Sequence, residues 1–189
     1  MDHSPPLTVA SATLQSHAVR IPPNANVVPA LLEAAQQAMS NSNANSAFVI
    51  TAVGSLSSVT LRMAATDNSP QNSHVVNTDT DCTCEVNSLQ SRNHDEAQTV
   101  SLKQTTSMRV QTIPNHLEIV SLVGTFSMDG GKHLHMSVAN AEGNVMGGHL
   151  IAGKVFTTIE LVLGTMPGVA FEREMDAVSG FKELFIRPS

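Results

Sequence analysis

The chain has 189 residues, which suffices for one domain with a substantial hydrophobic core, and no break in composition indicates a second core. Ten Lys and Arg residues against 16 Asp and Glu residues give a net charge of -6 without a basic cluster, so an autonomous nucleic-acid-binding surface is not expected. Trp and Tyr are absent, which argues against stacking on bases and predicts a core of aliphatic residues and Met.

The N-terminal segment MDHSPPLTVA lacks the basic start and the apolar block of a secretory signal. No apolar run reaches the ~18 residues of a membrane-spanning helix. We therefore expect a cytoplasmic protein without membrane contact, or a nuclear one if the source is eukaryotic, and the sequence does not identify the source. Residues 1–17 are expected to be loose, and residues 18–189 are expected to form a single domain.

The segment SHAVRIPPNANVVPALLEAAQQAM predicts a short strand, a Pro-Pro turn and a helix from Asn26 to Met39. Asn26 can cap this helix, and Pro29 falls in the first turn, where its missing N–H does little harm. An apolar stripe at helical spacing should pack on a sheet. It consists of Val28, Leu31, Leu32, Ala35 and Met39.

The next segment, SAFVITAVGSLSSVTLRMAAT, contains two β-rich runs broken at Gly54-Ser55, which predicts a strand, a turn or bulge, and a second strand. Residues 67–107 are polar and lack apolar periodicity, so we expect a mobile insertion without a core. Cys82 and Cys84 lie in it, too close together for an ordinary disulfide and too few for a zinc knuckle, so free thiols are expected.

Three further segments predict strands: the near-continuously apolar NHLEIVSLVGTFSM, which should lie deep in a sheet, then KVFTTIELVLG and FKELFIRPS. One early helix followed by strands in succession predicts an α+β fold. We expect a mostly antiparallel β-sheet with a packed N-terminal helix.

Three of the eight histidines lie within residues 130–150, GGKHLHMSVANAEGNVMGGHL. Ala141-Glu142-Gly143 can form a three-residue hairpin loop with Gly143 in the left-handed position. The resulting register places His135 directly opposite His149, and side-chain alternation gives one face of Leu, Met and Val. The other face carries His133, His135, His149, Ser137 and Gly147.

Three imidazoles on one face can hold a zinc ion at ~2.0–2.1 Å, and the small Ser137 and Gly147 leave a fourth position open. Nickel or iron would satisfy the same ligands. The alternative is that the histidines merely line a polar sheet face or a subunit contact. His116, on the neighbouring strand, is a candidate fourth ligand or a partner of a ligand, although a lone His at a strand start is more often solvated.

Two acids, Glu118 and Glu160, fall within apolar strands. A carboxylate buried without a partner is costly, so each should pair with a donor, coordinate metal or lie on an open sheet face. A structural partner such as Arg62 is favoured for one of them over a general acid or base role.

The pattern LEIVSLVGTF followed by HLHMSVANAEGNVMGGHL resembles the PPC (plant and prokaryote conserved) domain, also known as domain of unknown function 296. The resemblance covers most of residues 18–65 and 113–187. It implies a small antiparallel sheet with a packed helix, a homotrimer, and a metal, usually zinc, on the histidines matching His133, His135 and His149. The chain resembles the prokaryotic type, because no Arg-Gly-Arg AT-hook is present, and direct DNA binding is not expected.

Two classes of function follow. The favoured one is a trimeric metal-binding module that binds a protein partner or a small anionic ligand, with a link to DNA-associated complexes implied by the resemblance alone. The alternative is a metal-dependent hydrolase or lyase in which Glu118 or Glu160 handles the proton. An enzyme is the less favoured reading, because no Ser-His-Asp order, His-Glu-x-x-His motif or phosphate loop occurs.

Overall fold

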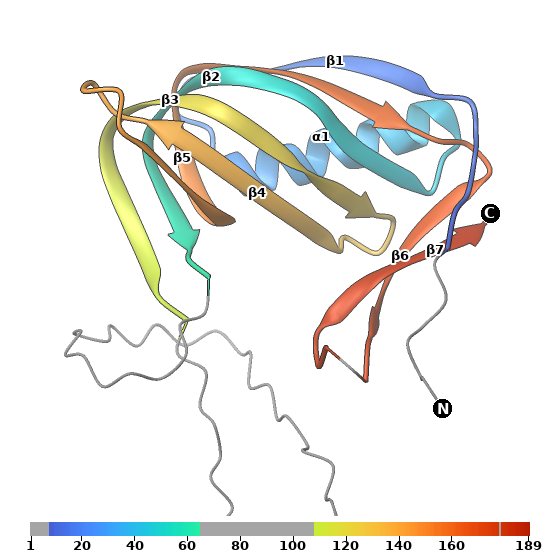
Figure 1. Cartoon of the computed structure of the whole chain (residues 1–189). Coiled ribbons are helices and arrows are strands. Elements are labelled where there is room, and N and C mark those ends of the chain that lie inside the picture. The colour runs from blue at the N-terminus through green and yellow to red at the C-terminus, as the bar shows by residue number, and fades with distance from the viewer. Residues whose placement is uncertain (1–7, 65–107, 178) are drawn as a thin grey trace, which may run out of the picture.

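The computed structural model describes residues 8–64, 108–177 and 179–189 (Figure 1). The predicted insertion at 67–107, with its two cysteines, lies outside the described residues. In chain order the elements are β1 (Gln15–Ile21), α1 (Val27–Ser42), β2 (Ser46–Arg62), β3 (Val110–Ser127), β4 (Lys132–Ala139), β5 (Val145–Thr165), β6 (Val169–Met175) and β7 (Lys182–Pro188). β1 therefore begins before residue 18, where the domain was expected to start.

The main sheet has the strand order β1-β5-β2-β3-β4, and every strand pair in it is antiparallel. β4 also pairs with β5, so β2, β3, β4 and β5 close into a small barrel. The start of β5 pairs with β4 and its end with β1, which requires the strand to curve (Figure 1). The α+β class and the antiparallel sheet are thus confirmed, whereas the closure was not predicted.

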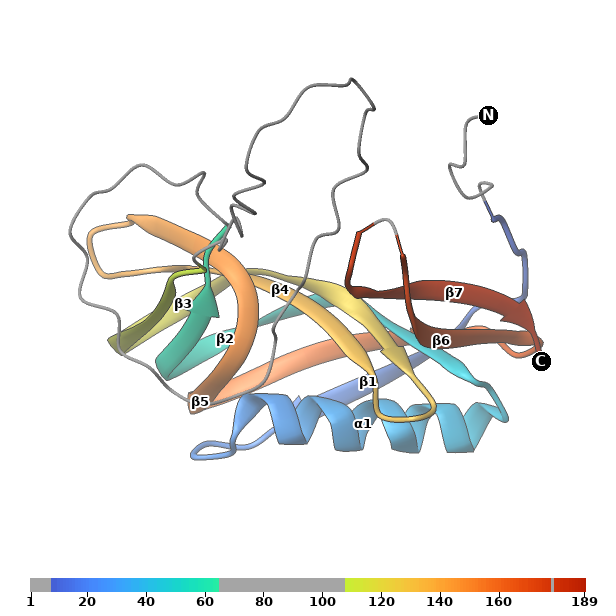
Figure 2. The same ribbon diagram turned by 90° about the horizontal axis from the view of Figure 1, so that it is seen from below.

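Helix α1 covers one side of this sheet, as Figure 2 shows. Its buried side chains join the core that the strands enclose, and they include Val28, Leu31, Ala35 and Met39 of the predicted stripe. Asn26 occupies the N-cap position, but its side chain makes no capping hydrogen bond, so that part of the prediction was wrong. No helix in the described part of the chain has the length and apolar character needed to cross a bilayer.

Two strands are longer than the sequence pattern predicts. β2 runs through Gly54-Ser55 without a turn, and a shift in its register with β5 at this point agrees with the predicted bulge, although the two runs form one strand. β5 joins the second strand of the histidine hairpin to KVFTTIELVLG, which we expected as a separate strand. Each strand has neighbours on both edges along part of its length, and these backbone hydrogen bonds keep it extended through local irregularities.

The C-terminal strands β6 and β7 form a separate two-stranded sheet. β7 confirms the strand expected from FKELFIRPS, but β6 was not predicted. Its consecutive charged residues Glu172, Arg173 and Glu174 hide the alternation of a strand. In the structure Arg187 of β7 donates hydrogen bonds to both glutamates, which gives these charges a partner.

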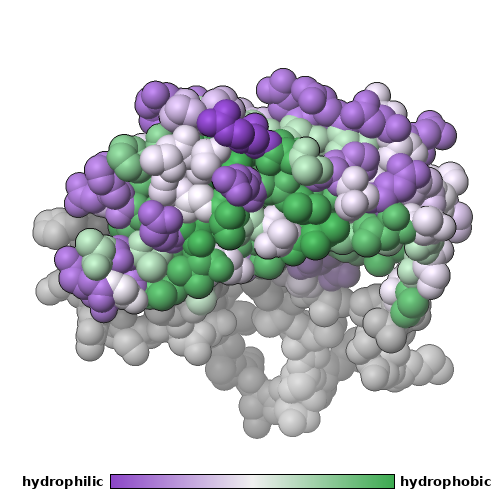
Figure 3. Space-filling model, turned by 90° about the horizontal axis from the view of Figure 1, so that it is seen from above, coloured by the Kyte–Doolittle hydropathy of each residue, from purple (hydrophilic) through white to green (hydrophobic). Residues whose placement is uncertain are grey.

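The sheet is apolar on both of its faces. Side chains directed inward form the core, and Leu61, Leu134 and Leu150 are at most 1% exposed. Other aliphatic side chains on β2, β3 and β5 are between 41% and 55% exposed, and they include Ile50, Val53, Val120, Val123 and Ile151. Figure 3 shows hydrophobic residues gathered across the surface of the sheet that faces upward in Figure 1.

Candidate metal centre

The β4–β5 hairpin closes as the sequence predicted. The Asn140 N–H donates to the Asn144 carbonyl at 3.1 Å, which leaves Ala141, Glu142 and Gly143 as a three-residue loop. Gly143 has a φ of 79°, the left-handed conformation expected at this position. The side-chain Oδ1 of Asn140 accepts hydrogen bonds from the backbone N–H groups of Glu142 and Asn144, and these bonds stabilise the turn.

The register of the hairpin is also the predicted one. His135 lies opposite His149, and Val138 lies opposite Met146. On β4 the side chains of Leu134, Met136 and Val138 are 1–2% exposed and enter the core. Because side chains alternate along a strand, the three histidines point to the outer face.

The three imidazoles converge at one point on that face. The candidate ligand nitrogens of His133, His135 and His149 all lie within 4.8 Å of one another, and the ring centroids are 5.0, 5.2 and 5.4 Å apart. The Nε2 atoms of His133 and His135 are 3.1 Å apart. Two nitrogens bound to a tetrahedral zinc ion at ~2.0–2.1 Å would be about 3.3 Å apart. The spacing of these two nitrogens therefore fits a shared cation, and the His149 ring would have to move inward to complete the set.

One ring nitrogen of the cluster has no partner. Nδ1 of His149 is buried, and no described residue forms a hydrogen bond with it. A buried polar atom without a partner is unfavourable, and native structures usually provide one. An atom of this kind, beside two other imidazoles, fits a ligand set that a bound cation completes.

Both shifted imidazoles of the cluster favour their neutral form. Burial, and next the positive charge of Arg62, lower the pKa of His149 to about 4. Burial, and next the charge of Arg173, lower the pKa of His133. A metal binds the neutral imidazole, so the surroundings of these two rings keep them in the ligating form at pH 7.

A glycine on β3 lets that strand pass close to the first histidine. Gly124 has a φ of 147°, and a Cβ on it would lie 2.0 Å from the His133 carbonyl oxygen. Any side chain at this position would push β3 away from β4. No local pattern in the sequence connects Gly124 with the cluster, because its effect depends on the pairing of β3 with β4.

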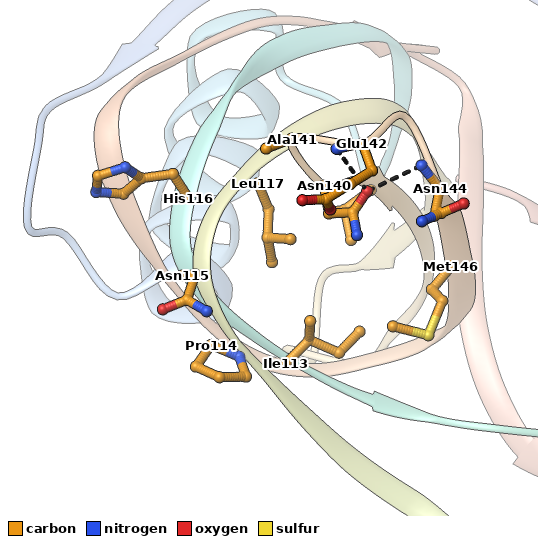
Figure 4. A pocket seen from close by; sticks show the side chains of 11 residues that line it. Ile113, Pro114, Asn115, His116, Leu117, Asn140, Ala141, Glu142, Asn144 and Met146 are labelled. Carbon is orange, nitrogen blue, oxygen red and sulfur yellow. Dashed lines mark hydrogen bonds between the residues drawn. The ribbon is translucent and has the colours of Figure 1, made fainter.

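His116, the predicted fourth ligand or partner of a ligand, is not part of the cluster. It stacks on Phe156 with 3.8 Å between ring centroids. Figure 4 shows its ring directed away from the mouth of the barrel, where a cavity of about 630 Å³ opens. Of the two readings of His116, the structure favours the solvated one: its side chain is exposed, and it lies nine residues before Thr125, the β3 residue opposite His133.

The two predicted acids are also distant from the histidines in the strand register. Glu118 lies opposite Ser55 and Ala139, Glu160 lies opposite Arg20 and Val53, and both acids are exposed. No carboxylate of a described residue belongs to the three-histidine group. Arg62, expected beside one of these acids, instead lies opposite His149.

A family model for the Plants and Prokaryotes Conserved (PCC) domain matches residues 94–167, a stretch that contains β3, β4, β5 and all three histidines. A curated relative, the bifunctional protein GlmU of Synechococcus sp. (strain JA-2-3B'a(2-13)), is 43% identical over 77 residues. The alignment covers 40% of this chain, and the chain spans only 12% of the length of that relative.

Several solved structures share the fold. A hypothetical protein from Salmonella enterica has a TM-score of 0.66 at 26% identity, with 95% of this chain and 97% of that chain covered. A metal-containing protein from Archaeoglobus fulgidus has a TM-score of 0.61 at 18% identity, with 95% and 99% covered. A PPC protein from Pyrococcus horikoshii has a TM-score of 0.59 at 19% identity, with 95% and 97% covered.

A candidate DNA-binding protein from Bacteroides thetaiotaomicron is also similar, with a TM-score of 0.55 at 15% identity and coverage of 93% and 96%. At this identity the likeness concerns the fold alone. The family match over β3 to β5 and the fold shared with the Pyrococcus protein agree with the resemblance found in the sequence. Residues 94–167 of the chain therefore match the Plants and Prokaryotes Conserved domain, and the fold agrees with that match.

Proposed function

We propose that this domain is a metal-binding module in which His133, His135 and His149 hold one divalent cation, with zinc as the first choice. The convergence of three ring nitrogens within 4.8 Å carries the proposal. The neutral form of His133 and His149 and the unpartnered Nδ1 of His149 support it. Nickel and iron accept the same imidazole ligands, so the identity of the cation is decided by metal analysis.

The open coordination position would bind a small ligand or a group of a partner protein. Ser137 and Gly147 lie opposite each other beside the histidines and offer little bulk there. A hydrolase or lyase would need a proton-transferring group within hydrogen-bonding reach of that position. Since no described carboxylate joins the cluster, binding is favoured over metal-dependent catalysis.

The experiment that tests the proposal is elemental analysis of purified, tag-free protein after dialysis against metal-free buffer. We expect about one divalent metal ion per chain. His149→Ala should remove the metal, whereas His116→Ala should retain it, because His116 lies outside the cluster. Wild-type protein that takes up no metal from a buffer containing zinc would refute the proposal.

We also propose that the domain assembles as a homotrimer. The exposed aliphatic side chains of β2, β3 and β5 would be covered by neighbouring copies, and closed cyclic symmetry gives each copy the same cover. Val53→Asp, at a residue that is 55% exposed, should lower the mass measured by sedimentation. Val9→Asp is the control, because Val9 is 78% exposed and precedes the first strand. A wild-type monomer at micromolar concentration would contradict the trimer.

Binding of DNA by this chain itself is not part of the proposal. The net charge is -6, and no basic cluster occurs in the sequence. The likeness to a candidate DNA-binding protein rests on fold at 15% identity. A link to DNA would therefore act through a partner protein bound to the module.

A further inference from the structure

We propose that Arg62 and Arg173 form a binding site for a small phosphate-type oxyanion over the three-histidine cluster. The inference deepens the proposed metal-binding function and rests on it, because the oxyanion would occupy the open coordination position. It names the chemical class of the small ligand and two residues that would recognise it.

Arg62 lies at the β5 border of the cluster. It is the last residue of β2 and is paired directly with His149. The preceding pair, Leu61 and Leu150, is fully buried, so Arg62 and His149 point to the outer face together. Directly opposed side chains in an antiparallel pair have Cβ atoms about 4.5–5.5 Å apart, which places the arginine side chain alongside the His149 ring.

Arg173 lies at the opposite border, beyond β4. Thr125 of β3 is paired directly with His133, so these two side chains share the outer face. The Nη2 atom of Arg173 donates a hydrogen bond of 2.7 Å to Oγ1 of Thr125. The strand order β2, β5, β4, β3 therefore places Arg62 on one side of the histidines and the guanidinium group of Arg173, bound to Thr125, on the other.

Neither guanidinium group is neutralised by a salt bridge with a described carboxylate. Along β6, Glu172 and Glu174 alternate with Arg173 and are bound by Arg187 on the other face. Asp129 accepts hydrogen bonds from Ser127 and Gly131.

After burial, the charges of Arg173 and Arg62 contribute to the lowered pKa of His133, in agreement with this placement. Lys132 adds a third positive charge near His149. The negative charge of Glu183 opposes them at both His133 and Arg173, and that of Asp129 also acts on Arg173.

The chemistry of two guanidinium groups around a cation favours a phosphate-type ligand. Each guanidinium presents a planar set of donors that fits carboxylate and phosphate oxygens. A carboxylate has two oxygens, which a single arginine can occupy in a bidentate pair. A tetrahedral phosphate has enough oxygens to contact both arginines and the cation at once, so the arrangement selects it over a carboxylate.

The test is calorimetric titration of the full chain with inorganic phosphate, before and after loading with one equivalent of zinc. A second series uses ethyl phosphate, which separates free phosphate from a phosphomonoester as the source of the oxyanion. Arg62→Gln and Arg173→Gln should each weaken phosphate binding about tenfold, the loss expected for a charge-assisted hydrogen bond. Zinc content, measured by elemental analysis, should not change. Arg20→Gln is the matched control, because Arg20 is exposed on β1 opposite Glu160.

Removal of the Glu183 charge should change the phosphate affinity in the opposite direction. Glu183→Gln should strengthen phosphate binding, because it removes the negative charge that acts on Arg173 and His133. Zinc-loaded wild-type protein that binds neither phosphate compound at millimolar concentration would overturn the inference and leave the metal site intact. Arginine variants that bind as tightly as Arg20→Gln would do the same. Failure to bind zinc would refute the proposed function, and the titrations of metal-free protein would still test the arginine pair.

Discussion

The β4–β5 and β6–β7 hairpins each gather polar side chains on one face, but they differ in what those side chains have as partners. On β6–β7, Arg187 binds Glu172 and Glu174, so the group contains both donors and acceptors and both signs of charge. On β4–β5, three like imidazoles meet, and one buried nitrogen has no partner. The charged side chains of the β6–β7 group pair with one another. The histidines of the β4–β5 group lack such pairing, and their arrangement fits the binding of a ligand.

In a structural polar cluster the side chains are partners for one another, whereas in a binding site they lack partners until a ligand binds. Exposed ion pairs such as those of Arg187 add little to stability, because water and salt screen them. Three imidazoles form no ion pairs of this kind with one another. The histidines converge on the outer face because the inner face of the hairpin is buried in the core. Their convergence provides a site for a cation.

The largest expected effect is on metal affinity. Structural zinc sites contribute about 10–16 kcal/mol, so His135→Ala, which removes one of three ligands, should weaken zinc binding on the order of 1,000-fold. Competition with a chromophoric chelator measures this change. The far-ultraviolet circular dichroism of the metal-free variant should match the wild type, because His135 is exposed and contributes nothing to the core. Unchanged affinity would place the metal elsewhere.

The second effect concerns the inner face of the same hairpin. Leu134 is 1% exposed and lies beside His133 and His135 in the sequence, but it points into the core. Leu134→Ala should lower the free energy of unfolding by about 2–5 kcal/mol, through lost burial and a residual cavity. Urea denaturation of the metal-free protein measures it. A loss below about 1 kcal/mol would show that the two faces of β4 are not divided as described.

The third effect is a pH dependence of the metal-free protein. His149 has a pKa of about 4 when folded and an ordinary value near 6.5 when unfolded. Between these values the unfolded chain binds the extra proton, so the free energy of unfolding should fall as the pH falls from 6.5 towards 4.

The contribution of His149 is on the order of 1 kcal/mol after allowance for solvent screening. It is measured as the difference between wild type and His149→Gln in urea titrations at several pH values. Parallel curves for the two proteins would contradict the lowered pKa. Because His133 and His149 stay neutral below pH 6.5, metal occupancy should also persist to lower pH than an unshifted histidine allows.

The smallest effect is expected on β6–β7. Arg187→Ala removes both ion pairs of that hairpin, but the side chains are 42–50% exposed. The midpoint of thermal unfolding should change little, and less at high salt, because water and salt screen exposed ion pairs. Thermal unfolding at two salt concentrations tests this. A fall in the midpoint as large as that caused by Leu134→Ala would mean that the ion pairs of Arg187 are important for the fold.

Local sequence patterns were sufficient to predict the hairpin and its two faces. The Asn-Ala-Glu-Gly-Asn turn determines which residues of β4 and β5 are opposite each other, and the alternation of side chains then places His133, His135 and His149 together. The helix stripe from Val28 to Met39 was readable for the same reason, because its period reflects neighbours only three or four residues apart. The unpredicted β6 shows the limit, since its charges find their partner in another strand.

The sequence by itself therefore determined the antiparallel sheet, the packed helix and the three converging histidines, because each depends on short-range geometry. Only the tertiary structure decided which distant residues border the histidines. Closure of the barrel brings Arg62 next to His149, and the docking of β6 on β3 brings Arg173 next to Thr125. The same pairing separates Glu118, Glu160 and His116 from the cluster. Contacts between strands far apart in the chain arise from burial of a shared core, and no local periodicity records which strand ends meet.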